Sequence, residues 1–376
     1  MRFKIIKKQF LEALSLVGNA VDAKANTEIE KCFLVETVGQ AIAITGTDLT
    51  IAINASLDCE VNEPGKACFP ADKLMSFVSA LQDGVVEFSC DKKFRATITS
   101  GRRTYKLAGM PADDFPHFKV SNGTPTRISF PSCNTLHEMI SSVASAASTD
   151  DTRRSLKGVC VNVDGKVVNA VATDGRRCAV ATRTVADLPD GVDSEAIIPS
   201  SSIRVLRTVL GRGGIEPVDV TVFGNSIRFL TGRTMFTTRI VDDRYPNFRQ
   251  VIPRAWSGKF TVDVGELVDE IKSCAVASVK MDKDDKIRAI FMAIADGEIH
   301  LVANSGDIAE SSTSIPVKFD GEFEATFNPD YLVDALTGAG CKEVEVRING
   351  DYNPIGIYSR DGESYICVLM PLRINR

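Results

Sequence analysis

Two aspartates, Asp48 and Asp174, come nearest to a catalytic pattern, because each follows a threonine at the end of an apolar run. Paired carboxylates can act as general acid and base when a nucleophile, a metal ligand or another titratable group lies beside them. Neither aspartate has a histidine or a candidate nucleophile nearby, and the equivalent segment later in the chain, residues 302–305, contains no aspartate. Aspartate is a common turn residue, so we expect both to shape turns and predict no catalytic residue and no enzymatic activity.

The ten cysteines and three histidines form no recognisable ligand pattern. No two cysteines make a C-x-x-C pair, and His117, His137 and His300 are far apart. The motifs G-x-x-x-x-G-K-[ST], H-E-x-x-H and G-x-S-x-G are also missing from the sequence. Without a secretion signal or an apolar run of about 18 residues, the sequence predicts a cytoplasmic protein that has reduced cysteines, no cofactor and no membrane contact.

Positive charge is concentrated on one predicted helix, although the net charge of the chain is −5. Arg204, Arg207 and Arg212 lie in a segment that has no acidic residue between Ser200 and Gly214. Arg204 and Arg207 share a helix face at the i, i+3 spacing. Further cations could extend this surface: Lys7, Lys8, Lys24, Lys73, Lys272 and Lys280. A basic helix face on an acidic chain indicates contact with a polyanion.

The elements that must carry these residues occur three times along the chain. The segments that begin at Pro70, Pro199 and Pro329 are alike, and the steps between them are 129 and 130 residues. The motif DDFPHF at residues 113–118 returns as DDRYPNF at residues 242–248. A period this long indicates a domain triplication rather than a solenoid of short repeats. We therefore predict three domains at residues 1–124, 125–257 and 258–376.

Each repeat contains two halves in which a strand leads into an amphipathic helix and then into further strands. In the first half, Phe3 and Ile5 alternate as a strand. A helical spacing follows in Phe10, Leu14, Val17 and Val21. Strands in which apolar and polar residues alternate favour antiparallel sheets with one solvated face. Helices would cover the other face. The sequence predicts an α+β fold, with linkers near residues 119–124 and 253–258.

The C-terminal segment YICVLMPLRINR contains an apolar run, residues 368–372. One interpretation is a last strand followed by a frayed tail. The other is a tail that walls a groove, because exposed apolar patches mark protein-binding sites and methionine suits several partners.

Several blocks of sequence, in order and spread over all three repeats, resemble the bacterial DNA polymerase III beta subunit, the sliding clamp. They are AITGTDLTI (residues 43–51), SGRRTYKLAGMPADDFP (100–116), VATDGRRCAV (171–180), IVDDRYPNFRQVIP (240–253) and VLMPLR (368–373). The resemblance implies three copies of the DNA-clamp domain, with antiparallel sheets outside and helices on the inner face, and two chains paired head to tail in a ring.

The resemblance also implies three sets of contact residues. A protein-motif pocket between the second and third domains would comprise Arg153, Leu156, Thr173, Gly175, Arg176, Arg177, Cys178, Pro246, Val251, Val368, Met370, Pro371, Leu372 and Arg373. DNA contacts would come from Lys24, Lys73, Arg204, Arg207 and Arg212. The seam between two chains would place Tyr105 and Leu107 against Val276 and Ala277.

This sequence departs from the family pattern inside the expected pocket and at the seam. The family commonly has histidine at 176 and leucine at 178, so Cys178 is expected to widen the pocket floor. The residues at 276 and 277 are smaller than is usual, which predicts a weaker seam. Residues 24–30, KANTEIE, replace the family segment RPTLPIL, and three residues follow Arg373.

The function implied is a homodimeric sliding clamp that encircles double-stranded DNA and gives the replicative polymerase its processivity. Expected partners are the DNA polymerase III alpha subunit, an ATP-dependent clamp loader, and other polymerases and repair proteins that carry short hydrophobic motifs. The expected location is the cytoplasm, at the nucleoid. The alternative is a protein-interaction scaffold that uses the same pocket without encircling DNA.

Overall fold

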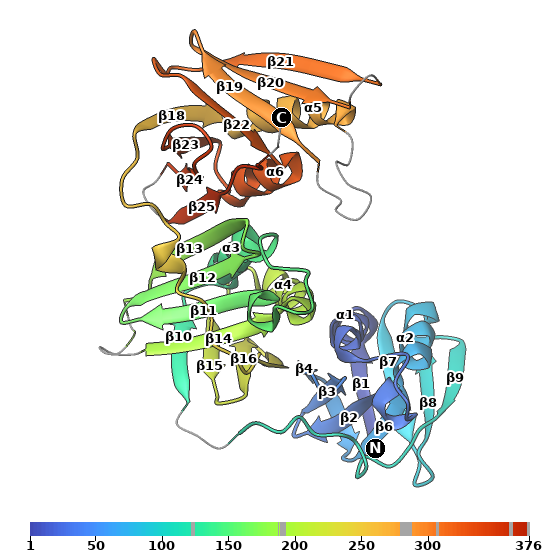
Figure 1. Cartoon of the computed structure of the whole chain (residues 1–376). Coiled ribbons are helices and arrows are strands. Elements are labelled where there is room, and N and C mark those ends of the chain that lie inside the picture. Colours follow the sequence, from blue (N-terminus) through green and yellow to red (C-terminus); the bar gives the residue numbers. More distant parts are fainter. Residues whose placement is uncertain are drawn as a thin grey trace. The chain divides into compact units, whose positions relative to one another are not determined.

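The computed structural model describes residues 1–121, 125–186, 188, 193–278, 288–305, 308–360 and 364–373. Within these residues the chain forms two units, each with its own sheets and core (Figure 1). Unit 1 comprises Met1–Leu136 and Arg204–Ile240, and unit 2 comprises His137–Ile203 and Val241–Arg376. Both units are therefore assembled from two separate stretches of the chain.

Unit 1 contains two antiparallel sheets. The first has the order β5-β1-β7-β8-β9, with strands β1 (Arg2–Ile6), β5 (Glu60–Glu63), β7 (Val85–Cys90), β8 (Arg95–Ser100) and β9 (Arg103–Ala108). The second has the order β10-β15-β16-β17-β4-β3-β2-β6. Its strands are β2 (Cys32–Val38), β3 (Ala41–Thr47), β4 (Ile51–Asp58), β6 (Lys66–Pro70), β10 (Thr126–Phe130), β15 (Val218–Val222), β16 (Ser226–Thr231) and β17 (Thr234–Arg239). The pairing of β4 with β17 makes the second sheet continuous.

Helices α1 (Lys7–Val17) and α2 (Ala71–Ala80) pack against each other in unit 1, and each contacts strands of this unit. The alternation expected for the first strand is confirmed, because Phe3 and Ile5 are buried while their neighbours are not. The Phe3 ring stacks on Phe88 with centroids 4.7 Å apart, and Phe10 of α1 meets Phe88 edge-on at 6.5 Å. Burial of each such ring stabilises the unit by roughly 2–3 kcal/mol.

Unit 2 repeats this arrangement with an eight-stranded and a four-stranded antiparallel sheet. The larger sheet has the order β14-β11-β12-β13-β25-β24-β23-β18. Its strands are β11 (Gly158–Asp164), β12 (Val167–Thr173), β13 (Arg177–Thr184), β14 (Asp193–Pro199), β18 (Gly258–Asp263), β23 (Glu343–Ile348), β24 (Ile355–Ser359) and β25 (Tyr365–Leu369). The smaller sheet, β21-β20-β19-β22, comprises β19 (Ile290–Ala295), β20 (Glu298–Asn304), β21 (Glu310–Pro316) and β22 (Phe323–Phe327).

The remaining α-helices described are α3 (Cys133–Ala144), α4 (Ser200–Gly213), α5 (Val264–Cys274) and α6 (Pro329–Gly338). Helices α5 and α6 pack together in unit 2, as α1 and α2 do in unit 1. One helix end differs from the sequence prediction, since Val21 is extended beyond α1. The 3-10 helix η5 (Ala275–Ala277) follows α5. None of the described helices is both long and apolar enough to cross a membrane.

The predicted α+β class with antiparallel sheets and three clamp domains is confirmed. The boundaries at residues 124/125 and 257/258 stay predictions. The segment expected to be a linker near residue 253 is held by contacts, since the Trp256 ring lies edge-on to Tyr358 at 6.1 Å and the Ser257 N–H donates to the Ile348 carbonyl. Part of the other expected linker, residues 122–124, lies outside the described residues.

Candidate protein-interaction site and DNA-contact surface

The turn between β12 and β13, residues 173–177, is built by its own side chains. The Thr173 hydroxyl donates to the Arg177 carbonyl at 2.5 Å and accepts the Gly175 N–H at 3.1 Å. Asp174 Oδ1 accepts the backbone N–H groups of Arg176 and Arg177 at 2.8 and 3.0 Å. Gly175 has a φ of 86°, a conformation that glycine adopts without strain. The prediction that Asp174 shapes a turn is confirmed.

Arg177 ties this turn to α6 and to the residue that follows α3. Its side chain is buried, and its Nε and Nη1 atoms lie 3.2 Å from Asp174 Oδ2 and 2.7 Å from Asp334 Oδ2. Its Nη2 donates to the Ser145 carbonyl, and its Cζ lies 4.0 Å from the centre of the Tyr331 ring. Burial acts to lower the pKa of Arg177, but the hydrogen bond to Asp334 and the two carboxylates raise the pKa above its ordinary value. The guanidinium therefore stays charged and anchors the turn.

A cavity of about 700 Å³ lies beside the turn. It is lined by Ser145, Ala147, Ser148, Thr149, Asp150, Arg153, Asp174, Gly175, Arg176, Arg177 and Tyr331. Four of the predicted pocket residues, Arg153, Gly175, Arg176 and Arg177, are thus brought together. Arg153 contributes a hydrogen bond to the Asp174 carbonyl at 3.4 Å and an ion pair with Asp150 at 3.6 Å. The wall of this cavity is polar, which suits a ligand with hydrogen-bonding groups.

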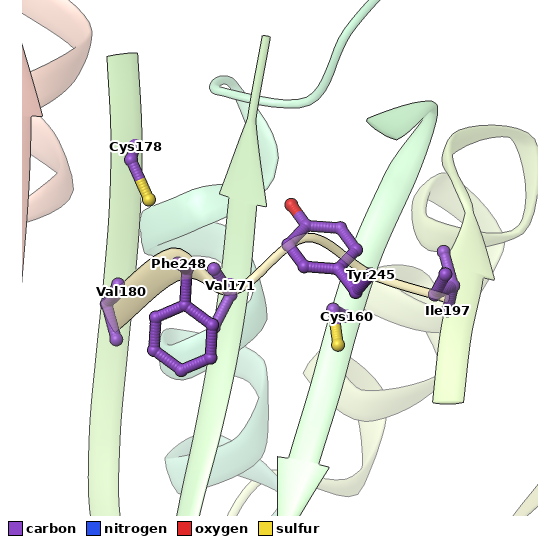
Figure 2. Packing of buried hydrophobic residues seen from close by; sticks show 7 residues of the cluster. All are labelled: Cys160, Val171, Cys178, Val180, Ile197, Tyr245 and Phe248. Atoms are coloured by element: carbon purple, nitrogen blue, oxygen red, sulfur yellow. The ribbon is translucent and has the colours of Figure 1, made fainter. Parts of the chain in front are cut away.

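The apolar part of the predicted pocket borders a packed cluster beneath the turn. The buried members of this cluster are Cys160, Val171, Cys178, Val180, Ile197, Tyr245 and Phe248 (Figure 2). Leu156 is half-buried and packs against it. Cys178 is 1% exposed, and burial raises the pKa of its thiol to about 12. Cys178 does not line the cavity beside the turn, so the expected widening of the pocket floor stays a prediction.

The C-terminal tail continues from β25 alongside the turn. Val368 is buried and lies opposite Cys178 in the pairing of β13 with β25. Beyond the strand, the Met370 N–H donates to the Arg176 carbonyl at 2.9 Å, and the Leu372 N–H donates to the Thr326 carbonyl at 2.7 Å. The described tail is therefore held in place rather than frayed, with Met370 42% exposed. Residues 374–376 lie outside the described residues.

The other predicted pocket residues are exposed or half-buried residues of unit 2. They are Pro246 and Val251, which flank the 3-10 helix η4 (Phe248–Gln250), and Pro371 and Arg373 of the tail. The sequence prediction missed Tyr331 and Asp334 of α6, which contact Arg177. Asp334 is 157 positions from Arg177, and no sequence motif joins the two. The i, i+3 spacing of Tyr331 and Asp334 on one helix face was the available signal.

The predicted DNA contacts are exposed residues of unit 1. Arg204, Arg207 and Arg212 lie on the exposed face of α4, and the Arg212 guanidinium donates to the Glu12 carbonyl at 2.8 Å. Lys24 lies in an exposed turn, and Lys73 of α2 is 3.7 Å from Asp72. Lys280, a further candidate, lies outside the described residues. These placements leave the DNA contacts as predictions.

The predicted seam residues lie at or beside the edge strands of two sheets. Tyr105 and Leu107 belong to β9, the edge of the five-stranded sheet in unit 1, and the Tyr105 ring stacks on Phe77 at 4.7 Å. Val276 and Ala277 belong to η5, which packs against β20 and the edge strand β21 in unit 2. Val276 is 84% exposed, whereas Leu107 is 8% exposed. Val276 is therefore available to a partner, and Leu107 offers little area.

Comparison with known proteins covers the whole chain. The N-terminal, central and C-terminal domain models of the DNA polymerase III beta subunit match residues 1–119, 132–247 and 249–373. A beta sliding clamp of Caulobacter vibrioides is 30% identical over 382 residues, and one of Pseudomonas aeruginosa is 27% identical over 377, with complete coverage of both chains in each case. The chain belongs to the DNA polymerase III beta subunit family. It is a sliding clamp, as the resemblance in its sequence implied.

Solved structures of DNA polymerase III beta subunits have the same fold over the full chain. A Pseudomonas aeruginosa sliding clamp bound to griselimycin aligns with a TM-score of 0.92 at 26% identity, covering all of both chains. A Caulobacter crescentus beta sliding clamp has polyethylene glycol bound to its putative beta-motif tethering region, and it aligns with a TM-score of 0.88 at 28% identity over both full chains. Clamps with this fold thus bind small ligands.

Proposed function

We propose that two copies of this chain close into a ring around duplex DNA and tether the replicative polymerase to it. The observation that carries the proposal is the full-length match of all three domains to sliding clamps. The function is non-catalytic, since tethering depends on a closed topology and not on a reacting group. The protein would act in the cytoplasm, on the DNA of the nucleoid.

The exposed arginines of α4 support a weak electrostatic contact with the duplex. Binding that depends on phosphate contacts alone loses affinity steeply as the salt concentration rises. A ring linked around circular DNA cannot leave sideways, so modest attraction is sufficient and allows sliding. The net charge of −5 fits this division between a basic helix face and an acidic remainder.

Retention on DNA tests the topological part of the proposal. The protein is incubated at high concentration with nicked circular DNA, washed in high salt, and measured before and after the DNA is cut once. We expect retention on the circle and rapid loss after linearisation. Loss from the circle in high salt would contradict encirclement and favour the scaffold alternative.

The edge strands β9 and β21 support pairing between two chains. An edge strand has unpaired N–H and C=O groups that can bind another strand, and the exposed Val276 lies on η5 beside β21. We expect light scattering to give about twice the 40.7 kDa mass of one chain and Val276→Glu to give monomers. Ile215→Glu is the matched control, because Ile215 is 85% exposed in the loop after α4. An unchanged mass for Val276→Glu would contradict the seam.

The cavity beside turn 173–177 and the adjoining tail support a pocket for short hydrophobic segments of partner proteins. The proposed partners are the polymerase alpha subunit, an ATP-dependent clamp loader that opens the ring, and other polymerases and repair proteins. A fluorescence-polarisation assay with a labelled glutamine- and leucine-containing motif peptide tests the pocket. The comparison is a chain that ends at Leu369, because β25 extends to Leu369 and must be retained. We expect the shortened chain to lose binding; equal affinity would exclude the tail from the site.

A further inference from the structure

Tyr245 is a buried tyrosine whose hydroxyl has no hydrogen-bond partner in the part of the chain that the structure describes. The residue is 7% exposed and belongs to the apolar cluster with Cys160 and Cys178. Its backbone N–H donates to Glu195 Oε1 at 3.0 Å, which fixes the main chain at this point. The Oη atom is shielded from solvent and has no hydrogen-bond partner among the described residues.

An unpaired buried hydroxyl is costly, so it requires an explanation. Burial raises the pKa of the Tyr245 phenol well above its ordinary value, and the neighbouring Cys160 and Cys178 act in the same direction. The Thr173 backbone lies near enough to oppose this rise in the pKa, but it does not form a hydrogen bond with the hydroxyl. The phenol is therefore protonated at neutral pH and has a proton to donate.

The position of the hydroxyl relates it to the predicted pocket. Figure 2 shows the Tyr245 oxygen pointing away from Ile197 and Cys160, toward the side of the cluster where Cys178 lies. Thr173 and Cys178 are both predicted pocket residues, as is Pro246, the next residue in the chain. Leu156, another of them, packs on the same cluster and is half-buried, so part of the cluster's cover is accessible to a ligand.

We propose that the Tyr245 hydroxyl is a specificity-determining group of the pocket, which donates a hydrogen bond to an acceptor on the side chain that a bound peptide inserts. This inference rests on the proposed peptide-binding function. A site with a buried donor discriminates against a ligand of the same shape that lacks the acceptor, because the donor is then left unpaired. The pocket would thus accept peptides with a polar atom at a position where an apolar floor would take only an aliphatic group.

Binding of two isosteric peptides to Tyr245→Phe tests the proposal. The peptides are motif peptides that differ only by threonine or valine at the inserted leucine position, and their affinities are measured by fluorescence polarisation. We expect Tyr245→Phe to shift the threonine-to-valine affinity ratio about three- to tenfold toward valine. An unchanged ratio would overturn the proposal and indicate that a buried water satisfies the hydroxyl. If neither peptide nor the parent leucine peptide binds the unmodified chain, the proposed pocket itself fails.

Tyr365 provides a matched control in the same unit. It is also buried, but its hydroxyl donates to the Ala335 carbonyl at 3.0 Å. We expect Tyr365→Phe to lower the Tm and leave the threonine-to-valine ratio unchanged, because it removes a buried hydrogen bond outside the predicted pocket. Tyr245→Phe should keep or raise the Tm. A clear fall in the Tm for Tyr245→Phe would show that the hydroxyl already has a partner and would overturn the proposal.

Discussion

The turn at residues 47–51 in unit 1 and the turn at residues 173–177 in unit 2 have the same hydrogen bonds. In the first, the Thr47 hydroxyl donates to the Ile51 carbonyl at 2.7 Å, and Asp48 Oδ1 accepts the N–H groups of Thr50 and Ile51 at 2.8 and 2.7 Å. The central residue has a positive φ in both turns, but it is Leu49 in unit 1, with a φ of 69°. The repeated threonine and aspartate thus specify one backbone conformation twice.

The two turns differ in the residue with which each ends. Ile51 is a buried apolar side chain, whereas Arg177 enters a network with Asp174, Asp334 and Tyr331. The turn of unit 2 also lines a polar cavity of about 700 Å³. Two turns with the same hydrogen bonds therefore have different surroundings, and only the turn of unit 2 is tied by an arginine into the wall of a candidate binding site.

The largest effect is expected for Arg177→Met, which leaves the two carboxylates without their partner. Removing one member of a buried charge network costs about 3 kcal/mol of the free energy of unfolding. Urea denaturation followed by Trp256 fluorescence measures this, because Trp256 is the single tryptophan and packs on Tyr358 of unit 2. Arg176→Met, in the same turn but exposed, serves as the control. Equal losses for the two variants would show that the network does not stabilise unit 2.

Asp174→Ala and Asp48→Ala are expected to differ by a smaller amount in the free energy of unfolding. Each substitution removes the acceptor of two backbone N–H groups, which costs about 1–2 kcal/mol. Asp174→Ala also removes an ion-pair partner of Arg177, so its loss should be greater, at about 3 kcal/mol. Far-ultraviolet circular dichroism during denaturation follows both units. If Asp48→Ala lowers the free energy of unfolding as much as Asp174→Ala does, the ion pair with Arg177 does not add to the stability of the turn at residues 173–177.

The smallest effects are expected at the central residue of each turn. Leucine pays about 1–2 kcal/mol in the left-handed region, so Leu49→Gly should be neutral or stabilising by up to about 1 kcal/mol. Gly175→Ala should lower the free energy of unfolding by about 1 kcal/mol. Residue 175 has a positive φ, which alanine adopts only with strain, and the added Cβ would lie 3.0 Å from Arg153 Nη1. Thermal unfolding of the Leu49→Gly and Gly175→Ala variants shows whether each substitution raises or lowers the Tm. Stabilisation by Gly175→Ala would show that the positive φ at residue 175 does not determine the stability of this turn.

The features that could be predicted from the sequence are those that repeat along the chain. The recurring strand and helix patterns gave the α+β class, and the repeated threonine and aspartate gave the equivalence of the two turns. Contacts between distant residues had no such signal: the Arg177 to Asp334 pair depends on the pairing of β13 with β25, which brings together two repeats. The segment near Trp256 has a linker-like composition, yet the Trp256–Tyr358 ring contact and the hydrogen bond from Ser257 to the Ile348 carbonyl hold it. Side-chain packing between repeats, and not local propensity, decides these features.

The pairing of β4 with β17 and of β13 with β25 has a consequence for synthesis on the ribosome. Strand β13 ends at Thr184 and its partner β25 begins at Tyr365, so about 180 residues must be made before the edge of β13 is covered. At about 5–20 residues per second, that edge waits roughly 10–40 s. The nascent chain therefore exposes a pairing-competent strand during translation, when neighbouring copies can compete for it and a chaperone would be most useful.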